Sequence, residues 1–118
     1  MGIRSEVILV VKRNPWDSLT IEQRAQVEDI MRLADETLEH SKGYLFRWDE
    51  IKWYHTDYDE IKALYDVLDE WDRGDFMLVC ATPEYPDDND ADRGNWWDNP
   101  WDLQKVVQVH LEFYQAPE

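Results

Sequence analysis

Apolar residues along this chain form short continuous runs and helical stripes that follow one another. Residues 5–12 are an unbroken run rich in Val and Ile, with charged residues at both ends. Such a run predicts a central strand that is buried on both faces. Residues 76–81 form a similar run and predict a second buried strand. Residues 14–17 contain a proline and predict a break after the first strand.

A first helix is predicted over residues 20–39. Thr20 and Gln23 have the spacing of a capping box, in which each side chain caps the backbone N–H of the other residue. Apolar residues then recur at helical spacing, and Gly43 provides a stop. The residues of this stripe are Ile21, Val27, Ile30, Met31, Ala34 and Leu38.

Residues 44–54 are rich in aromatic and β-branched side chains, which favours a strand. The large residues change phase after residue 48. Either a hairpin or a β-bulge at residues 49–50 explains this slip, and we favour the hairpin. The residues in the first phase are Tyr44, Phe46 and Trp48, and those in the second are Ile51 and Trp53.

A second helix is predicted over residues 57–72. Thr56 and Asp59 resemble another capping box, and the Arg-Gly-Asp segment at residues 73–75 ends the helix. Its apolar stripe consists of Ile61, Leu64, Tyr65, Leu68 and Trp71.

The end of the chain combines a long loop with a last predicted strand. Residues 84–102 are rich in Asp, Asn and Trp, and residues 105–114 alternate apolar with polar side chains. The resulting order is β-α-β-β-α-β with an extra strand. It predicts one α+β domain over residues 1–118, of the ferredoxin-like type, with two helices on one face of an antiparallel sheet. This fold serves many unrelated functions.

The net charge of the chain says more about its function than the rest of its composition does. The 118 residues include 27 acidic and 12 basic ones, so the net charge is −15. Solubility needs only about 2–8 charges on a small domain, and self-repulsion opposes folding beyond that. Negative charge also argues against direct binding to nucleic acid or to anionic membranes. The single cysteine and the absence of an apolar leader predict a cytoplasmic protein.

The surplus carboxylates collect in both predicted helices and in the loop. Asp35, Glu36 and Glu39 fall at the end of the first helix, where the helix dipole makes each anion cost about 0.3–1 kcal/mol. A charge run is usually a solvated surface, but this costly placement favours a surface that binds a partner. The predicted contact residues are Asp59, Asp66, Asp69 and Glu70 of the second helix, Asp87, Asp88, Asp90 and Asp92 of the loop, and Trp96 and Trp97.

Such a surface suits a protein that mimics nucleic acid and occupies a basic groove on another protein. Two alternatives use the charge differently. A protein-interaction module or homodimer would join through aromatic surface and use charge only for solubility. A nucleotide-binding sponge would need a basic pocket, for which the candidates are Arg4, Lys12, Arg13 and Arg47.

No catalytic or metal-binding motif stands out, so we predict a non-enzymatic protein with no cofactor and no metal ion. A glycine-rich phosphate loop and a cysteine-based zinc set are both missing, and the three histidines are scattered. Asp88, Asp90 and Asp92 resemble the opening of a calcium loop. Position 6 would be Arg93 rather than glycine and position 12 would be Asn99 rather than glutamate.

Two aromatic and acidic blocks, residues 48–54 and 94–101, are similar to those of small acidic proteins encoded by bacteriophages. The resemblance covers about half of the chain. It implies a protein made early in infection that blocks a host or defence protein in the cytoplasm of an infected bacterium. Phage inhibitors of this kind often present acidic surfaces that mimic DNA. The resemblance identifies no individual functional residue.

Overall fold

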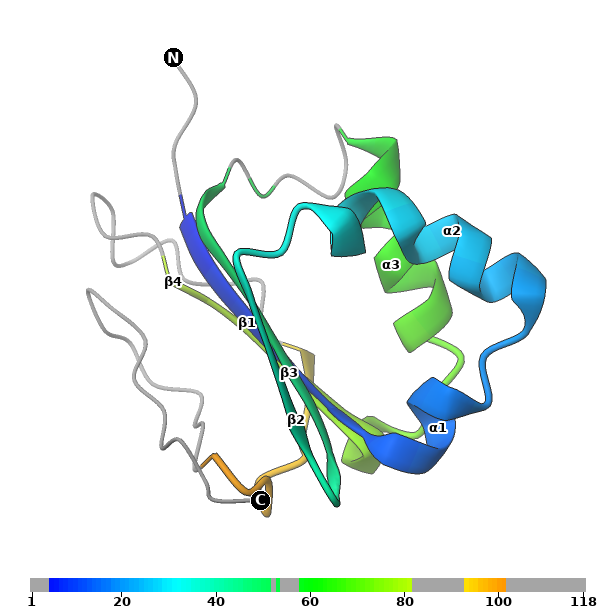
Figure 1. The fold of residues 1–118 in the computed structure, drawn as a ribbon, viewed down its shortest axis with the longest axis vertical. Coiled ribbons are helices and arrows are strands. Elements are labelled where there is room, and N and C mark those ends of the chain that lie inside the picture. The colour runs from blue at the N-terminus through cyan, green and yellow to red at the C-terminus, as the bar shows by residue number, and fades with distance from the viewer. Residues whose placement is uncertain (1–4, 52, 54–57, 82–92, 102–118) are drawn as a thin grey trace.

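The computed structural model describes residues 5–51, 53, 58–81 and 93–101. These residues form an α+β fold in which five antiparallel strands have the order β2-β3-β1-β4-β5. Figure 1 shows the three α-helices together on one side of the sheet. The elements are β1 (Ser5–Lys12), α1 (Arg13–Asp17), α2 (Ile21–Arg32), β2 (Glu36–His40), β3 (Gly43–Ile51), α3 (Asp59–Leu68), the 3-10 turn η1 (Arg73–Asp75), β4 (Phe76–Ala81) and β5 (Arg93–Gly94).

Strand β1 is the centre of the sheet and is buried on both faces, as predicted. Residues 7–11 have no exposed surface, because β3 and β4 pair with β1 on either side and apolar side chains cover both faces. Val7, Leu9 and Val11 face the helices, whereas Ile8 and Val10 belong to a cluster on the opposite face. The predicted strand at residues 76–81 is confirmed as β4.

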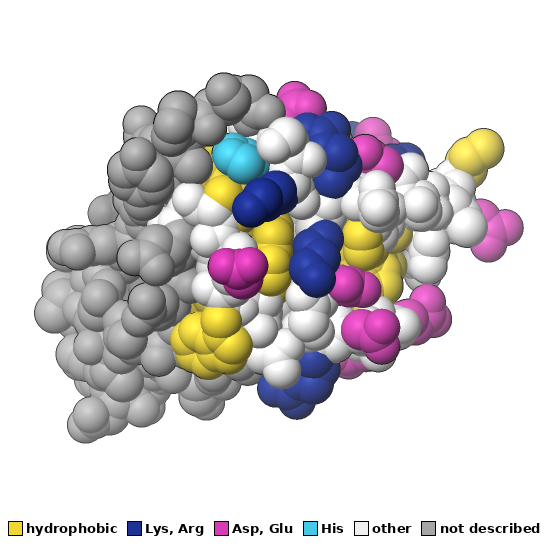
Figure 2. Space-filling view, turned by 90° about the horizontal axis from the view of Figure 1, so that it is seen from below, with side chains coloured by type: hydrophobic (Ala, Val, Ile, Leu, Met, Phe, Trp, Pro, Cys, Tyr) yellow, Lys and Arg dark blue, Asp and Glu magenta, His cyan; other side chains and the backbone are white. Residues whose placement is uncertain are grey.

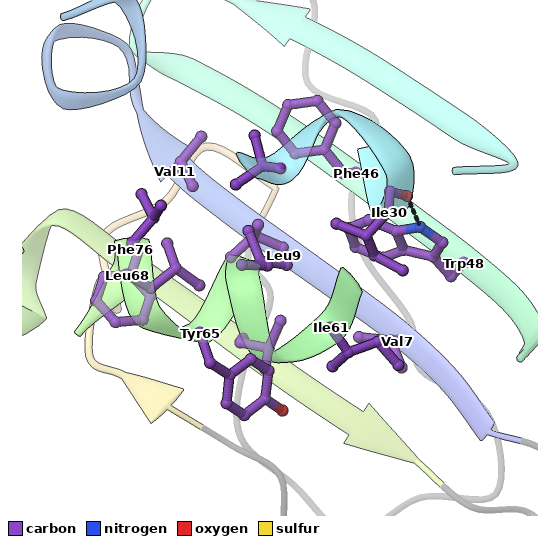
Figure 3. Close-up of a cluster of buried hydrophobic side chains, with 14 of the residues drawn as sticks. Val7, Leu9, Val11, Ile30, Phe46, Trp48, Ile61, Tyr65, Leu68 and Phe76 are labelled. Carbon is purple, nitrogen blue, oxygen red and sulfur yellow. Dashed lines mark hydrogen bonds between the residues drawn. The ribbon is translucent and has the colours of Figure 1, made fainter. Parts of the chain in front are cut away.

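The core between the helices and the sheet is rich in aromatic side chains (Figure 3). Trp48 of β3 is fully buried and its indole Nε1 donates a 2.8 Å hydrogen bond to the carbonyl oxygen of Ile30 in α2. Trp53 donates a 2.8 Å bond to the hydroxyl oxygen of Tyr65 in α3. These bonds satisfy buried polar atoms, which would otherwise cost about 1–3 kcal/mol each.

The opposite face of the sheet carries a second buried cluster. Trp96 and Trp101, which follow β5 in the chain, belong to it, and their rings meet edge to face at a centroid distance of 6.5 Å. Aromatic rings prefer this geometry to a parallel sandwich. The other members are Ile8, Val10, Leu45, Met77 and Val79, with Leu38 partly buried beside them.

The first predicted helix is too long at its C-terminal end. The capping box is confirmed, since Gln23 N donates to Thr20 Oγ1 at 3.0 Å and Thr20 N donates to Gln23 Oε1 at 2.9 Å. Helix α2 nevertheless ends at Arg32, and the following residues form the edge strand β2. Leu38 packs on the second cluster while Thr37 on its N-terminal side is exposed. The pairing of residues 36–40 with β3, in which side chains are buried alternately, therefore outweighs the helical spacing of the apolar residues.

Two features around the first strands also differ from prediction. Ser5 pairs with Ile51 and Val7 with Trp48, so β3 has one extra residue there and continues through a β-bulge. The favoured hairpin at residues 49–50 is therefore wrong, and the bulge is correct. The predicted break at residues 14–17 is the short helix α1, in whose first turn Pro15 is tolerated.

The second predicted helix is confirmed in its core but not at its ends. Ile61, Leu64 and Leu68 of the predicted stripe are buried. Helix α3 begins at Asp59 with Tyr58 as its N-cap. Thr56, from which a capping box is predicted, lies outside the described residues. Helix α3 ends at Leu68, which leaves the later residues of the predicted helix outside it. The loop at residues 84–92 and the strand at residues 105–114 lie outside the described residues.

Candidate partner-binding groove

The first turns of α2 and the last turn of α3 enclose a groove of about 490 Å³. We call it the α2–α3 groove. Three of its lining side chains are carboxylates: Glu22 of α2, Asp66 of α3, and Glu70, which follows the end of α3. The lining residues are Thr20, Glu22, Gln23, Gln26, Asp66, Val67 and Glu70.

Hydrogen bonds connect the two walls of this groove. The capping box orients Gln23, whose Nε2 donates to Oε2 of Glu70 at 3.4 Å and so links α2 to the end of α3. Val67 lies between the walls and is only 2% exposed, because it packs into the helix-side core. The groove therefore has polar, acidic walls above an apolar base.

The carboxylates of the groove are incompletely neutralised. Asp66 pairs with Lys62 of its own helix at 3.2 Å, although both side chains are mostly exposed. Glu22 and Glu70 form no ion pair with any Lys, Arg or His that the structure describes. Asp66 lies in the last turn of α3 and Glu70 follows the end of that helix. The groove thus carries a net negative charge that can attract a cationic partner.

The C-terminal end of α3 adds to this negative potential. Its last turn contains no basic residue, and Asp69 is its C-cap. The unsatisfied carbonyl groups make that end of a helix the negative end of its dipole. The prediction that Asp69, Glu70 and Asp72 lie in the last turn of the second helix is therefore correct at the C-cap Asp69 and wrong for Glu70 and Asp72, which follow the end of α3. The corresponding prediction for the first helix is wrong, since Asp35, Glu36 and Glu39 lie before or within β2.

Asp69 has a cationic partner from a distant part of the chain. Arg93 Nη1 of β5 lies 3.0 Å from Asp69 Oδ1, and its guanidinium carbon lies 4.6 Å from the ring centroid of Tyr65. Burial is the main cause that raises the pKa of Tyr65 to about 12, so this side chain is a neutral platform at physiological pH. The end of α3 therefore holds one stacked and paired arginine.

The structure brings together only some of the predicted contact residues. Asp66 and Glu70 line the α2–α3 groove, and Asp69 lies next to Glu70 in the chain. Asp59 is exposed at the start of α3, about 10 Å further along the helix axis. Glu22 was not predicted, because its position beside α3 depends on how the two helices pack. The loop residues Asp87, Asp88, Asp90 and Asp92 lie outside the described residues.

The two tryptophans predicted as contacts have different environments. Trp96 is 6% exposed within the second cluster, and its ring packs so tightly that a Cβ on Gly43 would lie 2.9 Å from it. Trp96 is therefore a buried anchor, and its assignment as a contact residue is wrong. Trp97 is 54% exposed, so a contact through this ring stays a prediction.

The acidic charge is not confined to one patch. Arg47 of β3 is surrounded by three carboxylates, from Glu6 at 3.6 Å, Glu36 at 3.1 Å and Asp49 at 3.5 Å. This second acidic group shares one arginine, unlike Glu22 and Glu70 of the groove. Figure 2 shows Lys and Arg side chains near the middle of the lower end of the molecule, with Asp and Glu mostly to one side. Positive and negative charges thus share this end.

Metal binding and membrane crossing are two further properties on which the described residues bear. None of their His, Cys, Asp and Glu side chains form a group of three or more that could hold a metal ion. Among the helices described, none has the length and apolar character needed to cross a membrane. Comparison with protein-family models, with curated proteins and with solved structures finds no match to the chain.

Proposed function

We propose that this protein is a non-enzymatic inhibitor that uses its acidic surface to bind a basic, nucleic-acid-binding site on another protein. The observation that carries the proposal is the convergence of Glu22, Asp66 and Glu70 on one groove. Two of these carboxylates form no ion pair with the described cations. A lysine or arginine from a partner would supply the missing charge.

Mimicry of nucleic acid follows from the same electrostatics. Duplex DNA presents one negative charge per about 1.7 Å of helix axis, and proteins that bind it line their sites with Lys and Arg. Carboxylates on α2, on α3 and just beyond the end of α3 offer such a site a group of neighbouring anions. Association would be fast and would weaken steeply with salt, because it depends on long-range attraction.

The proposal includes a ferredoxin-like fold and a bacteriophage origin. The succession β1-α2-β2-β3-α3-β4, with β1 and β3 adjacent, supports a ferredoxin-like assignment. The resemblance to acidic bacteriophage proteins supports a partner that is a host or defence protein in the bacterial cytoplasm. Direct binding to nucleic acid or membrane remains disfavoured by the net charge of −15.

The test compares two charge-matched double variants in affinity capture from bacterial lysate at low salt. Asp66→Asn with Glu70→Gln removes two charges from the groove. Glu28→Gln with Asp29→Asn removes two charges from exposed positions on α2, and each pair includes one carboxylate in an i,i+4 ion pair. We expect the groove variant to lose a captured protein that the control variant retains.

The captured protein must also be released by duplex DNA and by high salt, since the proposal requires competition for a basic groove. Equal capture by both double variants would reject the α2–α3 groove as the contact. A captured protein that stays bound at high salt and in the presence of excess DNA would reject nucleic-acid mimicry.

Exposed apolar side chains favour a second candidate function, that of an interaction module or homodimer. Ile21 is 89% exposed at the start of α2, and Trp97 is 54% exposed after β5. An interface through such side chains would hold or tighten as salt increases. Sedimentation at low and high salt, with wild type and Trp97→Ser, distinguishes this function from the acidic inhibitor.

A further inference from the structure

The end of α3 already binds a guanidinium group, which comes from the protein itself. Asp69 lies immediately before Glu70 of the α2–α3 groove and is 54% exposed at its side chain. Arg93 meets it with an N–O distance of 3.0 Å while stacking over Tyr65. Arginine suits this arrangement better than lysine, since its planar group can pair with a carboxylate and stack on a ring at once.

The backbone of β5 holds Arg93 in position. Arg93 is opposite Leu78 of β4, and the next residue, Gly94, has a positive φ of 77° where it packs against Phe76. Asn95 N donates a 2.7 Å hydrogen bond to the carbonyl oxygen of Arg73. The guanidinium is therefore tethered beside Asp69 at a high effective concentration.

We infer that Arg93 is an internal competitor that occupies Asp69 and weakens the binding of a basic partner to the same acidic surface. This inference rests on the proposed function. A partner arginine that approaches Asp69 has to displace Arg93 or leave this carboxylate unused. The ion pair between Asp69 and Arg93 thus lowers the affinity of the protein for a basic partner.

The test uses an oligoarginine peptide as the probe and compares Arg93→Gln with Arg32→Gln at low salt. Both variants remove one positive charge and release exposed carboxylates, since Arg32 lies 2.8 Å from Glu28 and 4.0 Å from Asp29. We expect Arg93→Gln to bind the peptide about two- to five-fold more tightly than Arg32→Gln, as expected for one exposed ion pair. In an Asp69→Asn background this difference should vanish.

Circular dichroism checks that each variant is folded. A second, more conservative variant tests the same contact. Arg93→Lys keeps the charge but loses the planar stacking group, so we expect tightening smaller than that of Arg93→Gln. Equal affinities for Arg93→Gln and Arg32→Gln, or a difference that persists in Asp69→Asn, would overturn the inference alone. Failure of wild type and all variants to bind the peptide would reject the proposed function and, with it, this inference.

Discussion

Trp48 and Ile30 are joined by a buried hydrogen bond in which the indole Nε1 donates to the main-chain carbonyl oxygen at 2.8 Å. Both side chains have no exposed surface. The bond links β3 to the last turns of α2, just before the chain turns back to form β2. It therefore fixes the C-terminal end of the helix whose N-terminal end forms a wall of the α2–α3 groove.

We expect Trp48→Phe to destabilise the fold by about 1–3 kcal/mol from the unsatisfied carbonyl group, with a further loss from the smaller ring. Urea unfolding measures the free energy. Trp97→Phe is the control, because Trp97 is 54% exposed and should change stability by less than about 0.5 kcal/mol. Similar losses for both variants would contradict a structural role for the Trp48–Ile30 bond.

Removal of the capping hydroxyl should weaken both α2 and the groove. Thr20→Ala is expected to cost about 0.5–2 kcal/mol, since the N–H of Gln23 loses its acceptor. Thr20→Ser keeps the hydroxyl and should retain most of the stability. Thermal unfolding of the two variants checks this, and NMR shifts at Glu70 report whether the link through Gln23 changes. An unchanged midpoint in Thr20→Ala would exclude the capping box as a source of stability.

Gly94 should not tolerate a side chain. Its φ is 77°, and a Cβ at this position would overlap the carbonyl group of Phe76. We expect Gly94→Ala to lose about 1–3 kcal/mol from the left-handed backbone, with an added cost from this overlap. Gly74→Ala is the control, because its nearest neighbour is Asn95 Oδ1 at 3.7 Å. Equal unfolding midpoints for the two variants would show that β5 can shift freely.

The strands of the sheet differ in how much the sequence alone could predict. Strands β1 and β4 are continuous apolar runs, and a run of that kind has few alternatives at this length. Leu38 lies four residues after Ala34 and is also flanked by polar residues, so it fits a helix and an edge strand equally well. Pairing with Leu45 of β3 decides the outcome. That pairing is a tertiary contact, which cannot be predicted from the periodicity of the sequence.

The same limit applies to the groove. Asp66 and Glu70 are predicted as neighbours from their i,i+4 spacing on one helix, and both line the groove although Glu70 lies just beyond the end of α3. Glu22 could not be predicted as their neighbour, since its place depends on the packing of α2 against α3. The ion pair between Asp69 and Arg93 joins residues 24 positions apart and depends on β5. Local spacing therefore identified one wall of the groove and missed the other.

Because the hydroxyl of Tyr65 is buried, we expect the free energy of unfolding to decrease at alkaline pH. The pKa of this hydroxyl is raised to about 12 by burial, whereas an unfolded chain has a tyrosine pKa of about 10. The folded state therefore keeps a proton that the unfolded state releases. This contribution is fully present below pH of about 10 and is lost as pH rises through about 12, up to about 2–3 kcal/mol.

Urea unfolding from pH 9 to 12 measures this loss. Because the hydrogen bond to Asp17 also raises the pKa of Tyr44, the late ionisation of Tyr65 is isolated as the difference between the ultraviolet titrations of wild type and Tyr65→Phe. Tyr65→Phe should lose the late ionisation and its share of the pH dependence, and should also be less stable at neutral pH because Trp53 Nε1 loses its acceptor. If Tyr65→Phe lost only a tyrosine that ionises at the ordinary pH, the raised pKa of Tyr65 would be contradicted.

We expect substitution of Trp96 to affect stability and substitution of Trp97 to affect binding. Trp96 is 6% exposed against Trp101 and Gly43, so Trp96→Ala should cost about 3–5 kcal/mol. Trp97→Ala should change stability by less than about 0.5 kcal/mol. If Trp97 is part of the partner contact, its loss should weaken capture of the partner while leaving the unfolding curve unchanged. Urea unfolding and affinity capture from the same protein preparation provide both measurements. A large stability loss in Trp97→Ala would make this residue a second anchor of the fold and would remove it from the contact surface.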